Sequence, residues 1–326
     1  MVCIVLPVTM PQKSKLIVDS LQAHYITKQG IIKAVDNVSF EIIGNESFGI
    51  AGETASGKST LGLALLRSLQ PPGKILGGEI ILNGQDISKI SDEQFDKTIR
   101  WKRIAMVFQG AMNTLDPVYT IGSQMNEIIK EHRINPKQES LISNSLRQVG
   151  LDPSIAARYP HELSGGMKQR VVIAMALLLD PEIIIADEPT TALDVLVQAQ
   201  IIELLKTLRR EKGLTVILIT HDLNLILEFA DKIGIMYAGQ LVEFGSSRDI
   251  YNCPKHPYTQ ALIASIPRLH SVNKDLQFIS GSPPNMLEPP AGCKFISRCP
   301  FAKELCQKDP PQVMTENGFV RCWLYK

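Results

Sequence analysis

Gly52-Glu53-Thr54-Ala55-Ser56-Gly57-Lys58-Ser59 matches the phosphate-binding pattern G-x-x-x-x-G-K-[ST]. The apolar run Phe48–Ala51 before it predicts a strand, and Thr60–Leu69 after it has a helical pattern, which is the context that the motif needs. Backbone N–H groups of such a loop, with the positive end of the following helix, favour a β-phosphate. Lys58 would supply a cation to the β- and γ-oxygens, and the Ser59 hydroxyl would ligate Mg²⁺. The octapeptide therefore predicts a phosphate site at a strand–loop–helix junction.

Two adjacent acids strengthen this prediction. Asp187 and Glu188 end the apolar run Ile183–Ala186, and an apolar strand that ends in acids is the expected partner of a phosphate loop. Asp187 would hold the Mg²⁺ shell, and Glu188 would polarise an attacking water. Either acid alone would be interpreted as a solvated side chain at the end of a strand. Together with the loop they indicate nucleotide hydrolysis.

Strands and helices alternate in the second half of the chain. Its two strands are continuous apolar runs, which are typical of a parallel sheet covered by helices on both faces. The predicted elements are a helix from Gly165, strand Ile183–Ala186, helix Val195–Arg210 and strand Thr215–Ile219.

The other parts of the chain have different patterns. Short apolar runs between turn residues predict strands over residues 16–50, and Gly77–Leu82 with Asn83-Gly84 predicts a strand and a hairpin turn. Residues 90–160 are more polar and indicate a helical insertion into the α/β core. Beyond about Gly245 the chain is Pro-rich and irregular.

Composition narrows the class of protein. The 326 residues include 34 basic and 33 acidic ones, a net charge of +1, so a nucleic-acid partner is not expected. The longest apolar stretch, Val171–Ala186, is broken by Asp180 and Pro181 and is too short to span a membrane. The apolar start Met1–Met10 lacks a basic region and a small-residue cleavage site, so it is a weak match to a signal peptide. A soluble, cytoplasmic protein is expected.

Further motifs give the sequence a resemblance to the ATPases of ABC transporters over nearly its whole length. Leu163-Ser164-Gly165-Gly166-Met167-Lys168-Gln169-Arg170 is similar to the ABC signature, and its glycines would let backbone N–H groups approach a γ-phosphate. Four other positions also match family motifs. Gln109 resembles the Q-loop glutamine, Thr191–Asp194 the D-loop, His221 the switch histidine and Tyr25 the aromatic residue that stacks on adenine.

The resemblance implies a fold and its divisions. The fold is α/β, a P-loop NTPase domain of the ABC ATPase type with a mixed sheet core, an antiparallel β subdomain and a helical subdomain that carries the signature. A C-terminal cysteine-rich extension follows. The ATPase domain is expected over residues 1–245, with the helical subdomain at about 90–165, and the extension over residues 246–326. ATP and Mg²⁺ are the implied substrate and cofactor.

The same resemblance implies roles for individual residues. Catalysis is assigned to Glu188, His221 and Gln109, and the Mg²⁺ shell to Ser59, Gln109 and Asp187. Nucleotide binding is assigned to Tyr25 and to the loop residues Gly52, Glu53, Thr54, Ala55, Ser56, Gly57, Lys58, Ser59 and Thr60. Asp194 belongs to the D-loop. The signature residues Ser164, Gly165, Gly166 and Gln169 would act on the ATP of a second subunit, so the chain is expected to pair with itself or with a similar ATPase.

Ala55 departs from the family pattern, which usually has Gly at this position of the loop. If the backbone there requires φ > 0, an alanine costs about 1 kcal/mol. We expect nucleotide binding to survive the departure.

Five segments are similar to the ATPase subunits of oligopeptide and dipeptide importers: Phe108–Met112 running to Asp116-Pro117, Ala186–Val195, Gln198–Gln200, His256–Thr259 and Gly281–Pro284. This resemblance implies peptide import driven by ATP-dependent closure of two ATPases, with two membrane permease subunits and an extracellular substrate-binding protein. Met167 and the pair Thr190-Thr191 favour a heterodimer with a different ATPase chain. The protein would lie peripherally at the cytoplasmic face of the cell membrane. Nickel import, oligosaccharide import and a soluble ABC ATPase outside transport are the alternatives.

Four cysteines crowd the C-terminal region. Five, six and fifteen residues separate Cys293, Cys299, Cys306 and Cys322, whereas zinc sites usually contain a pair two to four residues apart. Four thiolates suit a [4Fe–4S] cluster, and the region resembles the C-terminal extension of peptide-importer ATPases, some of which bind such a cluster. We therefore expect a [4Fe–4S] cluster that staples a loop-rich tail, with zinc or free thiols as alternatives. Cys3 and Cys253 stand alone, and a reducing cytosol disfavours disulfides.

Overall fold

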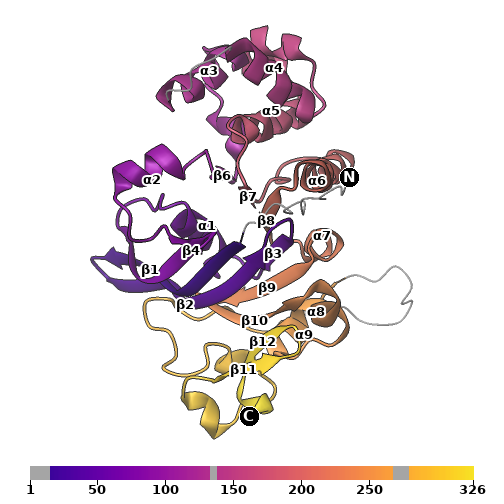
Figure 1. Cartoon of the computed structure of the whole chain (residues 1–326). Coiled ribbons are helices and arrows are strands. Elements are labelled where there is room, and N and C mark those ends of the chain that lie inside the picture. The colour runs from indigo at the N-terminus through magenta and orange to yellow at the C-terminus, as the bar shows by residue number, and fades with distance from the viewer. Residues whose placement is uncertain (1–14, 133–137, 267–278) are drawn as a thin grey trace, which may run out of the picture.

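The computed structural model describes residues 15–132, 138–266 and 279–326. The apolar start Met1–Met10, Cys3 and Pro136 lie outside the described residues. Helices α3, α4 and α5 form a separate layer at one end, two β-sheets occupy the middle, and the C-terminal elements lie at the other end (Figure 1).

The larger sheet has eight strands in the order β11-β12-β10-β9-β3-β8-β7-β6. Strand β3 lies between β8 and β9 in parallel pairs, and β7 pairs in parallel with β8 and β6. Strands β9, β10, β12 and β11 are joined by antiparallel pairs, so the predicted mixed sheet is confirmed. The bounds are β3 (Ser47–Ala51), β6 (Ile104–Val107), β7 (Ile183–Asp187), β8 (Thr215–Ile219), β9 (Lys232–Tyr237), β10 (Gln240–Ser246), β11 (Gln312–Thr315) and β12 (Gly318–Arg321).

The smaller sheet is antiparallel and has the order β2-β1-β4-β5. Its strands are β1 (Lys15–Thr27), β2 (Gly30–Ile43), β4 (Gly73–Leu82) and β5 (Gln85–Asp86). Asn83 and Gly84 have φ of 50° and 80°, and Leu82 pairs with Gln85 across them. Two positive φ angles are what a two-residue hairpin of the type I′ class requires. The hairpin turn expected at Asn83-Gly84 is therefore present.

Helices cover the larger sheet and form the α3–α5 layer. They are α1 (Lys58–Leu65), α2 (Asp92–Thr98), α3 (Ile121–Glu131), α4 (Gln138–Gln148), α5 (Gly165–Leu177), α6 (Val195–Lys212), α7 (Leu223–Phe229), α8 (Ser247–Asn252) and α9 (Pro257–Ala264). Short 3₁₀ turns lie at Ala111–Thr114, Pro153–Ala157, Pro160–Glu162, Ile296–Arg298, Glu304–Gln307 and Trp323–Tyr325. The range predicted as a helical insertion, residues 90–160, contains α2, α3 and α4, but it also contains β6, which belongs to the large sheet.

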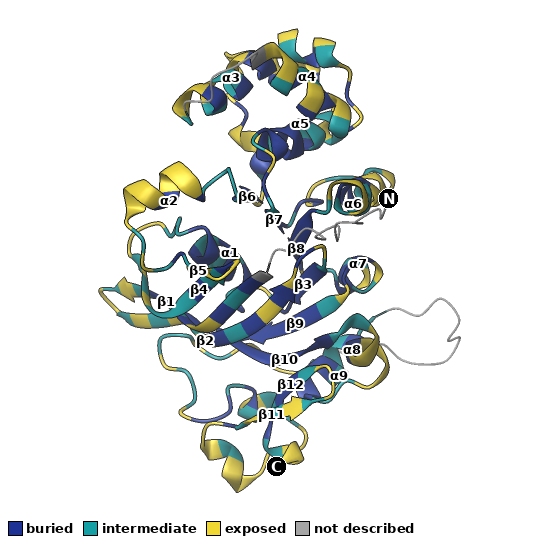
Figure 2. Cartoon of the chain, viewed as in Figure 1, coloured by how far each residue is buried: buried dark blue, intermediate teal, exposed yellow. Residues whose placement is uncertain are grey.

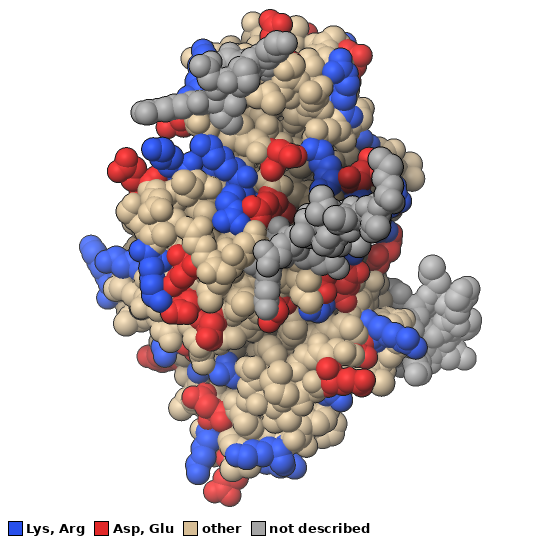
Figure 3. Space-filling view, viewed as in Figure 1, with Lys and Arg blue, Asp and Glu red and all other residues tan. Residues whose placement is uncertain are grey.

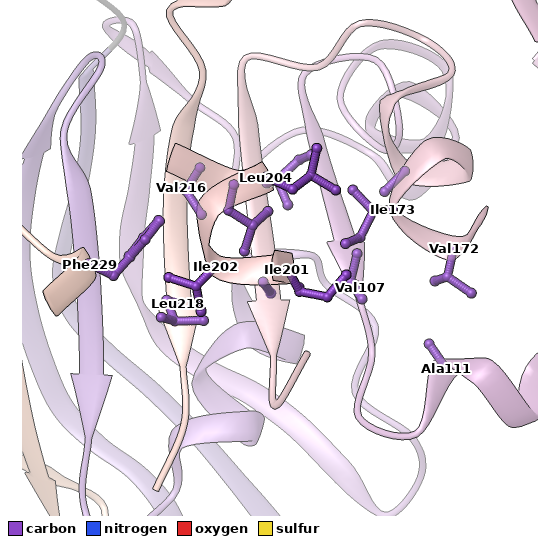
Figure 4. Close-up of a cluster of buried hydrophobic side chains, with 14 of the residues drawn as sticks. Val107, Ala111, Val172, Ile173, Ile201, Ile202, Leu204, Val216, Leu218 and Phe229 are labelled. Carbon is purple, nitrogen blue, oxygen red and sulfur yellow. The ribbon is translucent and has the colours of Figure 1, made fainter. Parts of the chain in front are cut away.

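The core lies where α6 and α5 pack on the parallel strands. Strands β7 and β8 are buried at every residue, as expected for strands covered on both faces (Figure 2). Helix α6 buries a stripe of residues spaced three and four apart, Ile201, Leu204, Leu205 and Leu208. Figure 4 shows Ile201, Ile202 and Leu204 of α6 beside Val216 and Leu218 of β8. This packing holds the parallel strands, and therefore the loops at their ends, in fixed positions.

The chain after β10 stays attached to the large sheet. Strand β12 pairs with β10 at Val320 and Phe319, opposite Glu243 and Phe244, and β11 follows at the edge. The predicted division between residues 245 and 246 falls inside β10, which ends at Ser246. The division into two domains stays a prediction.

No helix within residues 15–132, 138–266 and 279–326 has the length and apolar character needed to cross a membrane. On the face shown in Figure 3, Lys and Arg side chains are interspersed with Asp and Glu. This face therefore has mixed charge and lacks a single basic stripe.

Candidate functional site

The candidate site lies at one edge of the large sheet. Strands β3, β8, β7 and β6 are parallel neighbours, so their carboxyl ends meet at the same edge. The phosphate loop follows β3, Gln109 follows β6, Glu188 follows β7 and His221 follows β8. Motifs far apart in the sequence are therefore brought together by the order of the strands.

Two glycines of the phosphate loop are required by the backbone. Gly57 has φ of 102°, and a Cβ added there would lie 1.9 Å from the Ala34 carbonyl oxygen. A Cβ on Gly52, with φ of 153°, would lie 2.2 Å from the Met236 carbonyl oxygen. The loop thus passes too close to β2 and β9 for any side chain at either position.

Ala55 adopts the left-handed conformation, with φ of 64°. The backbone at position 55 therefore does require a positive φ, where the family usually has Gly. The side chain of Ala55 strains the loop in this conformation. Helix α1 begins immediately after Gly57, so the strained residue lies in the turn that presents the loop N–H groups.

Lys58 is buried, and its ammonium group lies against the loop. Its Nζ donates to the carbonyl oxygens of Gly52 at 2.7 Å and Glu53 at 2.9 Å. Burial lowers the pKa of Lys58, while the charges of Glu188, Asp187 and Glu53 oppose that shift. The cation is therefore placed between the loop and the acids of β7.

The acid pair takes up two different positions. Asp187 is buried and accepts a hydrogen bond of 3.1 Å from the Ser59 hydroxyl. Burial raises the pKa of Asp187 to about 6 and the nearby Glu188 charge adds to the shift, whereas Ser59 opposes it. A carboxylate and a hydroxyl at this separation are oxygen donors of the kind that Mg²⁺ prefers, so Ser59 and Asp187 fit the expected ion.

Glu188 forms a cluster with His221 and Thr191. The His221 Nδ1 lies 2.8 and 2.9 Å from the two carboxylate oxygens of Glu188, and the His221 backbone N–H donates to Oε1 at 3.1 Å. The Thr191 hydroxyl donates to Oε2 at 3.0 Å. Glu188 also has φ of 48°, a conformation that non-glycine residues adopt rarely and that concentrates at functional sites. The carboxylate is therefore held in one orientation at the edge of the sheet.

One cleft of about 310 Å³ brings most of the predicted residues together. It is lined by Thr54, Ala55, Ser56, Gly57, Lys58, Ser59, Thr60, Gln109, Glu188, Thr191 and His221. Tyr25, on β1, is half-buried over Gly73 and is not part of this lining. The sequence placed Thr191 in the D-loop and in the pair Thr190-Thr191, and its contact with Glu188 is an addition from the structure.

The signature residues lie elsewhere, at the start of α5. The Ser164 hydroxyl caps this helix by accepting the Met167 N–H at 3.3 Å, and Ser164 and Gly165 are exposed. Gln169 faces the interior and is 3 % exposed, so it does not share the surface of Ser164. Asp194 is exposed and caps α6 by accepting the Val197 N–H at 2.9 Å. None of these residues lines the cleft described above.

The sequence did not reveal two residues that contact the phosphate loop from the C-terminal region. The Tyr258 hydroxyl accepts the backbone N–H of Glu53, and the Arg298 guanidinium is paired with the Glu53 carboxylate. Tyr258 belongs to the segment His256–Thr259, which matched the peptide-importer pattern without a role attached. Nothing in the sequence pointed to Arg298.

The prediction of an iron–sulfur cluster is wrong. Over the three described segments of the chain, no group of three or more His, Cys, Asp or Glu side chains is arranged to hold a metal ion. Cys293, Cys299, Cys306 and Cys322 line one apolar cavity of about 10 Å³, which is room for about one water molecule.

Cys293 and Cys322 are buried, and Cys299 and Cys306 are partly buried. Burial raises the pKa of Cys293 to about 11 and also raises the pKa of Cys299 and Cys322. All four cysteines are free, so the tail is held together by packing.

Comparison with known proteins gives matches along the chain. A family described as ABC transporter matches residues 35–191, and one described as oligopeptide/dipeptide transporter, C-terminal region, matches residues 242–306. The chain is 43% identical over 315 residues to the dipeptide transport ATP-binding protein DppD of Caldanaerobacter subterraneus, covering 95% of this chain and 96% of that protein. It is 42% identical over 316 residues to the oligopeptide transport ATP-binding protein OppD of Salmonella typhimurium, covering 95% and 93%.

Solved structures give a matching fold. The ATP-binding cassette MJ0796, in a dimeric post-hydrolysis state bound to ADP and Pi, has a TM-score of 0.62 and 31% identity. The match covers 72% of this chain and 99% of the other. The fold is therefore shared with a protein whose structure holds ADP and Pi.

Proposed function

The chain belongs to the ABC transporter ATP-binding proteins of the dipeptide and oligopeptide type, and on that premise we propose that it hydrolyses ATP to energise peptide import through a membrane permease. The proposal rests on one observation above all. Glu188 is held by His221 and Thr191 in the lining of the cleft that also includes Lys58 and Ser59, and the Ser59 hydroxyl donates to Asp187.

The residues of the cleft can take separate roles in ATP hydrolysis. The loop N–H groups and Lys58 bind the phosphates and stabilise the charge that develops on the γ-phosphoryl group. Glu188 orients the attacking water and accepts its proton, and His221, which contacts Glu188, would contact the γ-phosphate. Mg²⁺ held by Ser59 and Asp187, with Gln109 nearby, would supply positive charge to the β- and γ-oxygens. Tyr25 is the proposed stacking partner of adenine.

A second ATPase subunit is part of the proposal. Ser164 and Gly165 are exposed at the start of α5 and do not line the cleft of their own chain. A signature that serves the ATP of a partner explains this separation, and the solved relative MJ0796 is described as dimeric. Met167 and Thr190-Thr191 favour a partner of different sequence. We propose that the pair lies peripherally at the cytoplasmic face of the membrane, on two permease subunits served by a substrate-binding protein.

The test is ATP-driven uptake by the whole transporter reconstituted in vesicles. With its permease, partner ATPase and binding protein, the chain should drive uptake of labelled dipeptides or oligopeptides, and no uptake should follow when ATP is omitted. The Glu188→Gln variant should still bind ATP but lose roughly 10²–10⁴ in turnover, the usual worth of a general base.

Two results would contradict the proposal in different ways. Uptake of nickel or oligosaccharides in place of peptides would leave the engine intact and change the cargo. Near-normal hydrolysis by Glu188→Gln would remove Glu188 from its proposed role.

A further inference from the structure

Glu53, the second residue of the phosphate loop, is held by a side chain from the C-terminal region. Arg298, at the end of the 3₁₀ turn Ile296–Arg298, donates from its two terminal nitrogens to the two Glu53 carboxylate oxygens at 2.8 and 2.9 Å. The Arg298 side chain is 4% exposed and the Glu53 side chain 25% exposed. This is a two-pronged, charge-assisted pair, which fixes the plane of the carboxylate as well as its position.

Arg298 is itself fixed on every side. Its Nε donates to the Ser280 carbonyl oxygen at 2.9 Å, and its terminal nitrogens also reach the Ile279 carbonyl oxygen at 3.4 Å and the Tyr237 hydroxyl at 3.3 Å. The guanidinium carbon lies 5.8 Å from the ring centres of both Tyr237 and Phe295. An arginine so constrained cannot follow Glu53 if the loop moves, so the loop is held to the tail.

The backbone of Glu53 is held from the same side. Its N–H donates to the Tyr258 hydroxyl at 2.8 Å, and Tyr258 is fully buried in α9. The Tyr258 ring lies 4.6 Å from the Tyr237 ring and 5.4 Å from the Phe295 ring, measured between centroids. Strand β9, helix α9 and the tail therefore form one aromatic support beneath the loop.

The opposite side of Glu53 faces the phosphate site. Its carbonyl oxygen accepts a hydrogen bond from Lys58 Nζ at 2.9 Å and another from the Ser56 N–H at 3.2 Å. One residue thus connects the C-terminal region to the loop cation through a carboxylate, an N–H and a carbonyl group. The Arg298–Glu53 ion pair therefore acts on the residue of the loop that also contacts Lys58.

We propose that Arg298 is a positioning residue for the phosphate loop, through which the C-terminal region sets the affinity for nucleotide. The inference rests on the proposed function in that ATP binds at this loop. Arg298 fixes Glu53, Glu53 fixes the first half of the loop, and the loop N–H groups with Lys58 then meet the phosphates without reordering. Arg298 itself does not touch the nucleotide.

The experiment measures Kd for Mg-ATP by calorimetric titration of the full chain, and KM and kcat by steady-state kinetics of the complex assembled with its partner ATPase and permease. Arg298→Gln should raise Kd and KM together, each by about tenfold, as supporting residues around bound ions do. The kcat at saturating ATP should be kept, because Glu188 and His221 are untouched. Arg298→Lys keeps the charge but loses the fork, so its Kd should lie between those of Arg298→Gln and the natural chain.

A matched control lies at the other edge of the sheet. Arg103 pairs with Glu182 at 2.6 Å just before β6 and β7, whose amino ends point away from the phosphate loop. Arg103→Gln should lower the melting temperature and leave Kd unchanged. Glu53→Gln tests the same contact from the loop side should Arg298→Gln fail to fold, and it should weaken ATP binding. Both substitutions remove the same ion pair, so the double variant Arg298→Gln/Glu53→Gln should have a Kd no higher than that of the single variant with the higher Kd.

The possible results distinguish the positioning role of Arg298 from the proposed function of the protein as an ATPase. If the natural chain binds ATP and Arg298→Gln or Glu53→Gln binds it equally well, the positioning role is refuted. An equal loss in Arg103→Gln would also refute it, because the effect would then be one of general stability. If the natural chain binds no ATP, the proposed function itself is overturned.

Discussion

Ala55 carries a cost that its neighbours in the loop avoid. With φ of 64° it occupies a region that glycine adopts freely. Ala55→Gly should relieve this strain and raise the free energy of unfolding by up to about 1 kcal/mol, with tighter ATP binding. Chemical denaturation and calorimetric titration measure the two effects. Ala199→Gly, at an exposed position inside α6, is the control and should have the opposite sign, a loss of about 1 kcal/mol. A loss at both sites would show that Ala55 is unstrained.

His256 is a source of acid sensitivity. It is 1% exposed, its Nδ1 accepts the Tyr258 N–H at 3.1 Å, and burial lowers its pKa to about 3. In the unfolded chain a histidine has a pKa near 6.5. The folded state therefore binds this proton more weakly than the unfolded state does. The contribution of His256 to the free energy of unfolding is fully present above pH 6.5 and is lost as the pH falls toward 3. The loss between pH 7.5 and 5 is about 2 kcal/mol.

Urea unfolding of the natural chain and of His256→Asn at both pH values checks this loss. Asparagine keeps an acceptor at the helix cap and cannot titrate, so the variant should lose about 2 kcal/mol less on acidification. Asp187, whose pKa is raised to about 6, acts with the opposite sign, but it is present in both proteins and cancels in the difference. Equal losses in the two proteins would exclude His256 as the source.

At the level of elements, the buried stripe of α6 contributes to the free energy of unfolding, whereas the exposed first turn of α6 does not. Leu205 is fully buried against the parallel strands, whereas Leu196, in the first turn, is 77% exposed. Leu205→Ala should lower the free energy of unfolding by about 2–5 kcal/mol through lost contacts and the cavity left behind. Leu196→Ala should change it by less than about 0.5 kcal/mol. Urea titration compares them, and similar losses would contradict the packing described for α6.

Strongly patterned elements were predictable from sequence, and weakly patterned ones were not. The continuous apolar runs at Ile183–Ala186 and Thr215–Ile219 became β7 and β8, and the loop before α1 came from its glycine spacing. The tail was expected to be irregular, yet it contains α8, α9 and the hairpin of β11 and β12. Those strands have four residues each. β12 gains its conformation by pairing with β10 and β11 by pairing with β12, a tertiary effect that local propensity does not record.

The candidate site was predictable to a similar extent. Lys58, Glu188 and His221 belong to local motifs, and the parallel sheet brings those motifs to one edge. Thr191 and Arg298 contact the site through side chains whose partners depend on the folded arrangement, so spacing alone could not find them. The cysteine spacing suggested a cluster because it records four thiols without recording the size of the cavity they enclose.

For the whole molecule, the separation of cleft and signature predicts dependence on a partner. Gly165 is exposed on α5, away from the cleft of its own chain. Gly165→Asp should place a negative charge where the partner's γ-phosphate would approach, and ATP hydrolysis by the assembled complex should fall at least about tenfold. ATP binding by the isolated chain should be unchanged. Full hydrolysis by the assembled variant would show that the α5 start takes no part in the partner's site.

Glu53 and Arg298 are 245 positions apart, and this distance has a consequence for how the protein is made. A ribosome adding about 5–20 residues per second needs roughly 10–50 s to travel from one to the other. The phosphate loop therefore emerges from the ribosome well before the arginine that pairs with it. A chain released too soon would carry the complete octapeptide without the arginine that holds it. If Arg298 positions Glu53 as proposed, the full affinity of the loop for nucleotide is reached only after Arg298 has been synthesised and has paired with Glu53.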